Sequence, residues 1–351
     1  MKRTFLILAV ATLVASTPFS AYAANTTSLE VSGWIPYWRV KEGTADARKH
    51  LSQLTEINPF AYSVKADGTL YDNMKIGGKD WQRLFKDARK KDVRIIPTIM
   101  WSDSANIHAI LSNPAKRAAH IKAIVAMVEE NDFDGVDIDY ENKKAETINY
   151  FSVFLKELDA ALQTRLLMCT IESRTPLSSR YTNPPATMQY ANDFVEINKY
   201  CDRVRMMMYD QSTIDIKLNA AADGPYTPLS DVAWVEKVVG LAAQDIAKDK
   251  LVIAVPTYGY EFELTQTGSR YTYKKLWSFN PKYATDLAKK YRVKPERNGA
   301  GELSFEYTPK KSTTTNIVWW SDAVAIGQKV DLAKRLGVRG VALFKIDGSE
   351  D

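Results

Sequence analysis

Acidic residues stand at every second position of one stretch of this chain, at Asp137, Asp139 and Glu141. If the stretch is a β-strand, the three carboxylates share one face, with successive acids roughly 6.5–7 Å apart along the backbone. Ile138 and Tyr140 then lie on the other face and can pack against helices. Carboxylates crowded in this way repel one another, and partial burial raises the pKa of some of them. The pattern favours acid–base catalysis with one carboxyl protonated near neutral pH.

The acidic row has no role in packing, because an apolar residue would cost less at an interior position. A solvated edge strand is disfavoured by the apolar opposite face. A calcium loop counted from Asp137 needs Gly at its sixth position and Glu at its twelfth, where this chain has Asn142 and Ile148. A magnesium site on two of the acids stays open as an alternative; our prediction is a site without metal.

The wider pattern, four acids from Asp134 to Glu141 with Gly135 after the first, resembles the active-site signature of glycoside hydrolase family 18. That family includes chitinases, endo-β-N-acetylglucosaminidases and bacterial spore-cortex or peptidoglycan hydrolases. The resemblance implies that Glu141 is the general acid, that Asp139 orients and stabilises the substrate acetamido group, and that Asp137 shares a proton with Asp139. It also implies substrate-assisted catalysis with retention of configuration, and no cofactor.

A second stretch, MMYD from Met207 to Asp210, resembles the Met-x-Tyr-Asp motif of the same family. The resemblance implies that Tyr209 donates a hydrogen bond to the acetamido carbonyl and that Asp210 contacts the sugar. Aromatic rings at predicted strand ends can stack on the apolar faces of sugars, although core packing is the alternative for each ring. Glu172 is a further candidate for a polar contact near the same rim. The predicted substrate-binding residues are Tyr37, Trp38, Tyr62, Trp101, Asp210, Gln211, Tyr258 and Phe344.

Eight strand-like runs alternate with amphipathic segments, which indicates a parallel βα architecture. Closed on itself, this is an α/β fold of the TIM (β/α)8 barrel type, in which catalytic residues lie at the carboxyl ends of strands. A long interval after the seventh run, 262–316, predicts a small α+β insertion that walls one side of a cleft. No eighth helix follows the last run, so either the barrel is open there or the chain is a shortened product. The runs are Val31–Trp38, Ile57–Val64, Arg94–Met100, Gly135–Glu141, Arg165–Glu172, Arg203–Tyr209, Leu251–Tyr258 and Gly340–Ile346.

The substrate is predicted to be a polysaccharide with β-1,4 bonds and N-acetylglucosamine units, such as chitin or chito-oligosaccharides. Two departures from typical chitinases leave alternatives open: the third run lacks Ser-x-Gly-Gly, and Phe344 stands where a Trp is usual. The run Lys250–Tyr260 is more similar to the spore-germination and cortex-hydrolase branch, so a peptidoglycan or spore-cortex N-acetylglucosaminidase is the first alternative. The second is a non-catalytic glycan-binding barrel, against which the presence of Glu141 argues.

The first residues predict export. Residues 1–23 combine Lys2 and Arg3, an apolar run and Ala21-Tyr22-Ala23, which is the pattern of a secretory signal peptide. The catalytic domain is then 28–351, and the protein is secreted or periplasmic with no membrane span. The formal net charge of +5 becomes +3 without that segment, which does not indicate a nucleic-acid partner. For Cys169 and Cys201 a disulfide and two buried thiols are both compatible with the sequence.

Overall fold

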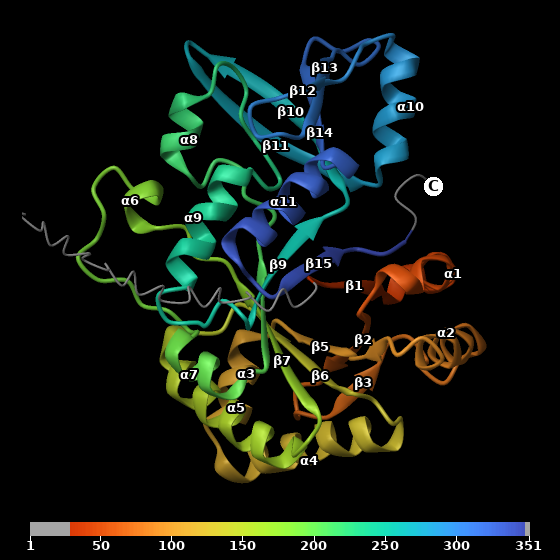
Figure 1. The fold of residues 1–351 in the computed structure, drawn as a ribbon. Coiled ribbons are helices and arrows are strands. Elements are labelled where there is room, and N and C mark those ends of the chain that lie inside the picture. The colour runs from red at the N-terminus through yellow and green to blue at the C-terminus, as the bar shows by residue number, and fades with distance from the viewer. Residues whose placement is uncertain (1–28, 348–351) are drawn as a thin grey trace, which may run out of the picture.

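A closed parallel barrel forms the body of the protein in a computed structural model that describes residues 29–347 (Figure 1). The first strand pairs with both the second and the last, so the TIM-barrel prediction is confirmed and the open-barrel alternative is wrong. The predicted signal peptide lies outside the described residues. The barrel strands, in chain order, are β1 (Glu30–Pro36), β2 (Glu56–Val64), β5 (Thr98–Trp101), β6 (Gly135–Tyr140), β7 (Leu166–Glu172), β8 (Arg203–Met207), β9 (Leu251–Pro256) and β15 (Gly340–Phe344).

Helices cover the outside of the barrel, and several begin where the sequence supplies a capping side chain. Asn113 accepts hydrogen bonds from the first turn of α4 with Pro114 next to it, and Asp322 caps α11 in the same way. The described helices outside the insertion are α1 (Val40–His50), α2 (Lys79–Arg89), α3 (Ser104–Leu111), α4 (Pro114–Glu130), α5 (Ile148–Leu162), α6 (Leu177–Arg180), α7 (Phe194–Tyr200), α8 (Ile216–Ala221), α9 (Val232–Ala242) and α11 (Ala323–Leu336), with 3-10 turns at Tyr37–Arg39, Leu51–Gln53 and Ala145–Thr147.

The third predicted strand is broken into two pieces. The short β4 (Arg94–Ile95) pairs with β2, and the barrel strand resumes at Thr98 in β5. Pro97 stands between them and has no backbone N–H to donate to a neighbouring strand, which explains the interruption. A further short strand, β3 (Leu70–Asp72), pairs antiparallel with the end of β2.

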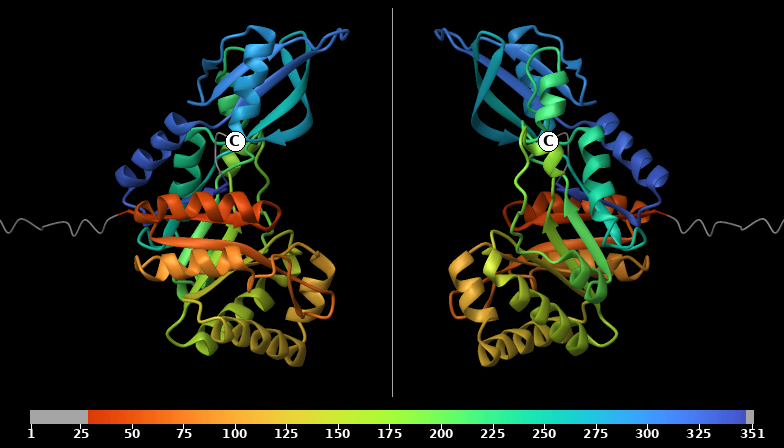
Figure 2. Two further views of the ribbon diagram at one scale, coloured as in Figure 1. Left: turned by 90° about the vertical axis from the view of Figure 1, so that its right-hand side faces the viewer. Right: turned by 90° about the vertical axis from the view of Figure 1, so that its left-hand side faces the viewer.

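The insertion forms a second lobe beyond the ends of β9 and β15 (Figures 1 and 2). It is a five-stranded antiparallel sheet with one helix, and it is wider than the predicted 262–316 because its first strand continues almost directly from β9. Buried residues between the sheet and the helix, among them Phe279, Ala284 and Trp320, form its own core. Its elements are β10 (Gly259–Thr267), β11 (Arg270–Phe279), α10 (Pro281–Tyr291), β12 (Glu296–Arg297), β13 (Leu303–Tyr307) and β14 (Thr315–Trp320).

Strand β6 pairs with β5 on one side and with β7 on the other, and all its residues are buried. Ile138 and Tyr140 belong to the core between the barrel and its helices, as their alternation predicts. Gly135 is required by packing, because a Cβ there would overlap the backbone carbonyl of Leu166 on β7. Asp134 accepts a hydrogen bond from the backbone N–H of Ile95 at 2.7 Å and so ties the start of β6 to β4.

A disulfide joins Cys169 on β7 to Cys201, which follows α7. Both residues are buried, and the alternative of two free thiols is wrong. Between residues 29 and 347, no helix has the length and apolar character needed to cross a membrane.

Candidate active site

A cleft of about 970 Å³ opens at the carboxyl ends of the barrel strands, between the barrel and the insertion. Asp139 and Glu141 reach it from β6, and the insertion contributes its first strand, the end of β11 and one side of α10, which agrees with the predicted role of the insertion as a wall. The lining residues are Trp38, Arg39, Phe60, Asp139, Glu141, Glu172, Ser173, Met207, Tyr209, Asp210, Tyr258, Tyr260, Ser278, Phe279, Asn280, Lys282, Tyr283, Asp286, Phe344, Lys345 and Asp347.

Asp137, the first acid of β6, lies beneath the cleft and has no exposed surface. Its Oδ2 accepts hydrogen bonds from the hydroxyl of Thr98 at 2.7 Å and from the indole N–H of Trp34 at 3.3 Å. Its Oδ1 accepts from the hydroxyl of Thr170 at 2.8 Å, and the guanidinium of Arg205 lies 3.1 Å from Oδ2. Asp137 is therefore a buried carboxylate whose two oxygens both have donors.

Asp139 and Glu141, unlike Asp137, line the cleft. Asp139 is 4% exposed, and its Oδ1 has no hydrogen-bond partner within residues 29–347. Burial, together with the negative charges of Glu141 and Asp137, raises the pKa of Asp139 well above its usual value of 3.8. Burial and the carboxylates of Glu172 and Asp210 likewise raise the pKa of Glu141 above its usual 4.5. Asp139 and Glu141, which both reach the cleft, therefore keep their protons to higher pH than exposed carboxyls do.

Lys143 and Glu172 add a pair of opposite charges beside these acids. The Lys143 side chain is almost fully buried, donates to the backbone carbonyl of Tyr140 and lies 4.0 Å from Glu172. Its ammonium also stands 4.4 Å from the ring centre of Phe151, and burial lowers its pKa below 10.5. Burial acts to raise the pKa of Glu172, but Lys143 and several hydrogen bonds hold that pKa below its usual value. One of these bonds comes from the backbone N–H of Asn142 at 2.9 Å.

Tyr209 and Asp210 follow β8 and face the same cleft. The ring of Tyr209 stacks on Phe344 with centroids 5.5 Å apart and meets Tyr258 edge-on. Burial and the nearby carboxylates raise the pKa of Tyr209 well above 10, so its hydroxyl keeps the proton that it would donate to a ligand. Asp210 has a left-handed backbone with φ of 56°, and it accepts hydrogen bonds from the hydroxyls of Tyr258 at 2.6 Å and Tyr260 at 2.7 Å.

The sequence comparison with protein families agrees with this arrangement: the family model described as glycosyl hydrolases family 18 matches residues 31–349. The chain belongs to family 18 of the glycosyl hydrolases. Its curated relatives include the uncharacterized glycosylase YvbX of Bacillus subtilis, 24% identical over 243 residues that cover 69% of this chain and 65% of the relative. A cortical fragment-lytic enzyme of Bacillus anthracis is 22% identical over 314 residues, covering 88% of this chain and 68% of that protein.

Solved structures share the fold of this family 18 chain. A chitinase from Chromobacterium violaceum superposes with a TM-score of 0.75 at 18% identity and covers 92% of this chain and 96% of that one. The spore cortex-lytic enzyme SleL of Bacillus cereus superposes with a TM-score of 0.72 at 20% identity, covering 91% and 71%. The chain spans 65% of YvbX and 53% of a putative sporulation-specific glycosylase of Bacillus subtilis, so these curated relatives are longer than the region they share with it.

Four residues predicted to bind substrate do not line the cleft of this family 18 barrel. Trp101 pairs in register with Tyr140, so it lies on the helix-facing side of the wall and is 3% exposed. A bulge between Phe60 and Tyr62 shifts the register of β2, so that Phe60 faces the cleft and Tyr62 is buried in the core below the helices. The prediction that Trp101 and Tyr62 form sugar subsites does not fit these positions.

Gln211 and Tyr37 are the other two. Gln211 is buried; its amide donates to the hydroxyl of Tyr226 at 2.8 Å and accepts from the backbone N–H of Asp231 at 2.8 Å, so it holds a loop after β8. Tyr37 is 44% exposed beside Trp38, and of this pair only Trp38 lines the cleft.

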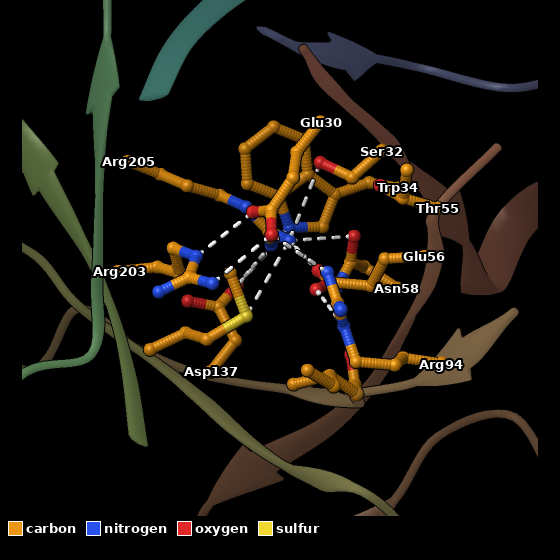
Figure 3. Close-up of polar contacts among 12 residues, drawn as sticks. Glu30, Ser32, Trp34, Thr55, Glu56, Asn58, Arg94, Asp137, Arg203 and Arg205 are labelled. Atoms are coloured by element: carbon orange, nitrogen blue, oxygen red, sulfur yellow. Dashed lines mark hydrogen bonds and ion pairs between the residues drawn. The ribbon is translucent and has the colours of Figure 1, made fainter. Parts of the chain in front are cut away.

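Several residues around the acids were not predicted from sequence, above all Arg205, which reaches Asp137 from β8 (Figure 3). Arg205 lies two residues before Met207 and four before Tyr209, so the period of two places it on the inward face of its strand. A charged residue at an inward barrel position is the signal that could have identified it. Phe60 and Lys143 were also missed, because nothing local in the sequence distinguishes them from core and surface residues.

Proposed function

We propose that this protein is a retaining glycosidase that cleaves β-1,4 bonds in polymers containing N-acetylglucosamine. The observation that carries the proposal is the position of Glu141, an acid with a raised pKa in an aromatic-lined cleft. A carboxyl that keeps its proton toward neutral pH can donate it to the leaving glycosidic oxygen. Membership of family 18 supports the same chemistry.

The nucleophile in this proposal is the acetamido oxygen of the substrate, since family 18 is an exception to the scheme with two catalytic carboxylates. Tyr209 presents its hydroxyl to the cleft and would hold that carbonyl in position. Asp139 would contact the acetamido N–H and stabilise the positive charge that develops as the oxazolinium ring closes. Glu141, having given up its proton, would then take one from the attacking water, and configuration would be retained.

Aromatic rings on both sides of the cleft support a glycan as ligand. Trp38 is 49% exposed at the rim, and Phe60, Tyr258 and Phe344 form the floor and wall around it. Their faces suit the apolar C–H surfaces of sugars. A non-catalytic glycan-binding barrel is the less favoured hypothesis, because Glu141 and Asp139 are both in place.

A second candidate substrate is the glycan of peptidoglycan or spore cortex. It is favoured by the curated and structural relatives whose names describe cortex lysis, although they are 20–22% identical and extend beyond the shared region. Export to an oxidising compartment is part of the proposal. The disulfide between Cys169 and Cys201 supports it, because such bonds are rare in the cytosol.

Turnover assays on chitin oligomers and on purified peptidoglycan, run side by side, would test the proposal. We expect hydrolysis of at least one of them, with NMR showing the β-anomer as first product. Absence of hydrolysis on both, or an α-anomer as first product, would contradict it. The Glu141→Gln variant is the control, because it should bind oligomers without cleaving them. If it shows no hydrolysis, the activity of the wild type does not come from a contaminating enzyme.

A further inference from the structure

Charged residues gather in the interior of the barrel around Asp137 (Figure 3). At the centre is Arg205, which has no exposed surface. Its guanidinium lies 3.1 Å from Asp137, donates to the side-chain oxygen of Asn58 at 2.8 Å and pairs with Glu56. It also lies over the ring of Trp34, 4.8 Å from the centroid. The buried cation Arg205 thus connects Glu56 on β2 to Asp137 on β6.

A second group of charges lies below it, around Glu30. The carboxylate of Glu30 receives Arg203 at 2.8 Å, Arg94 at 3.1 Å and Arg339 at 3.0 Å. Arg94 also lies 3.6 Å from Glu56, which joins this group to Arg205. The connected network therefore holds four arginines against three carboxylates, an excess of one positive charge beneath the cleft.

We propose that Arg205 is a positioning residue that keeps Asp137 ionised, so that the single proton of the Asp137–Asp139 pair resides on Asp139. Asp137 Oδ2 faces Trp34 and Arg205, whose N–H groups can only donate, so that oxygen must act as an acceptor. Asp139 Oδ1, in contrast, has no partner among the described residues. The network below supplies the positive charge that holds the anion in place.

The other charged groups around the pair agree with this assignment. Glu141 and Lys143 act on Asp139 from its own chain segment and Glu172 acts on it from β7, whereas Asp210 at the end of β8 acts on Glu141. Glu56 faces Asp137 only through Arg205. A cation within 4–6 Å lowers the pKa of a carboxyl by about 1–3 units, whereas a fixed neighbouring anion raises it. Arg205 therefore adds a positive charge to the hydrogen-bond donors of Asp137 and widens the difference between the two acids.

The consequence for catalysis rests on the proposed function. If Asp139 is neutral, the cleft carries one negative charge fewer before substrate binds. Once Glu141 has given its proton to the leaving oxygen, the hydroxyl of Asp139 can donate a hydrogen bond to the new carboxylate, which stays able to take a proton from the attacking water. The other oxygen of Asp139 is then free to accept the acetamido N–H.

The protonation state is testable without any substrate, by carboxyl 13C NMR titration of the protein labelled at aspartate side chains. Asp137→Asn and Asp139→Asn assign the two signals. In the wild type we expect the Asp139 carbon to titrate while the Asp137 carbon keeps its carboxylate shift through the same pH range. In Arg205→Met both carbons should titrate together, and Arg205→Lys should restore the wild-type behaviour.

Glu56→Gln is the matched control, because it alters the same buried network but leaves Arg205 against Asp137. Its Asp137 carbon should keep the carboxylate shift. If Arg205→Met does not fold, the double variant Arg205→Met/Glu56→Gln, which leaves no unpaired glutamate, replaces it. Should that also fail, Asp137→Asn decides: removal of a fixed anion must lower the midpoint of the Asp139 titration by about 1 unit or more.

An unchanged Asp139 midpoint in Asp137→Asn, or an Arg205→Met protein in which both carbons behave as in the wild type, overturns the inference. In the active enzyme the same change appears as a shift of the acidic limb of the kcat/KM profile to higher pH in Arg205→Met. Loss of stability alone would lower activity without moving that limb. If wild type hydrolyses no glycan, the proposed function fails, but the NMR result still decides the role of Arg205.

Discussion

The ammonium of Lys143 lies 4.0 Å from the carboxylate of Glu172, at the carboxyl ends of β6 and β7. The two charges act on Glu141 in opposite directions: Glu172 raises the pKa of Glu141 and Lys143 lowers it. If Glu141 is the general acid, as we propose, it must be protonated to act, and this pair then adds to burial in setting the pH at which activity is lost on the alkaline side.

Substitution of either partner should therefore move the alkaline limb of the kcat/KM profile. Glu172→Gln removes a neighbouring anion, lowers the pKa of Glu141 and shifts the limb to lower pH. Lys143→Met removes a cation and shifts it to higher pH. The two variants serve as controls for each other, and limbs that stay in place or move in the same direction would contradict this account.

Glu141→Gln should abolish turnover while oligosaccharide binding persists. General acid catalysis contributes about 10²–10⁴-fold, and the loss should be larger if Glu141 serves both steps, as we propose. Single-turnover assays and calorimetric binding to chitin oligomers separate the two effects. A variant with near-normal kcat would show that Glu141 is not the acid.

Tyr209→Phe keeps the ring that stacks on Phe344 and removes one hydrogen-bond donor. If the hydroxyl holds the acetamido carbonyl in the transition state, kcat and kcat/KM should fall together by about tenfold or more, since 1.4 kcal/mol is a factor of ten. Steady-state kinetics on acetylated and deacetylated oligomers measure this. Equal effects of the substitution on both substrates would argue against substrate assistance.

Trp38→Ala should raise KM for long oligomers, because the exposed ring lines the cleft and offers a stacking surface. We expect a change of about tenfold, because covering a large apolar side chain contributes about 1.5–3 kcal/mol and 1.4 kcal/mol is a factor of ten. Tyr71→Ala removes an aromatic of similar exposure, 52%, that is not part of the cleft, and its KM should match the wild type. Equal KM values in all three proteins would exclude Trp38 from binding.

Replacement of Cys169 and Cys201 by alanine should lower the free energy of unfolding by about 2–4 kcal/mol, because the bond restricts the unfolded chain. Denaturant titration of the wild type and the double variant measures the loss. Activity at low temperature should be retained, since neither cysteine lines the cleft. Identical unfolding curves would show that the bond does not form in solution.

The sequence by itself determined the chemistry of β6 and the order of the elements. Alternation with period two is a local property, so three acids spaced by two residues must share a face wherever the strand lies. The face of β6 that turns toward the barrel interior could also be assigned from the local sequence. The residues between the acids are apolar and therefore pack against the helices, which leaves the acids on the inner face. The eight strands and the insertion could be located for the same reason, since each is marked by its own pattern of apolar residues.

Only the tertiary structure decided which of the candidate aromatic residues reach the cleft and which cation lies against Asp137. A bulge in β2 turned Phe60 toward the cleft and Tyr62 away from it, and strand register placed Trp101 behind Tyr140. Arg205 reaches Asp137 across 68 residues of sequence. Such pairings depend on how neighbouring strands align, and register is a property of two strands together that neither strand's own residues reveal.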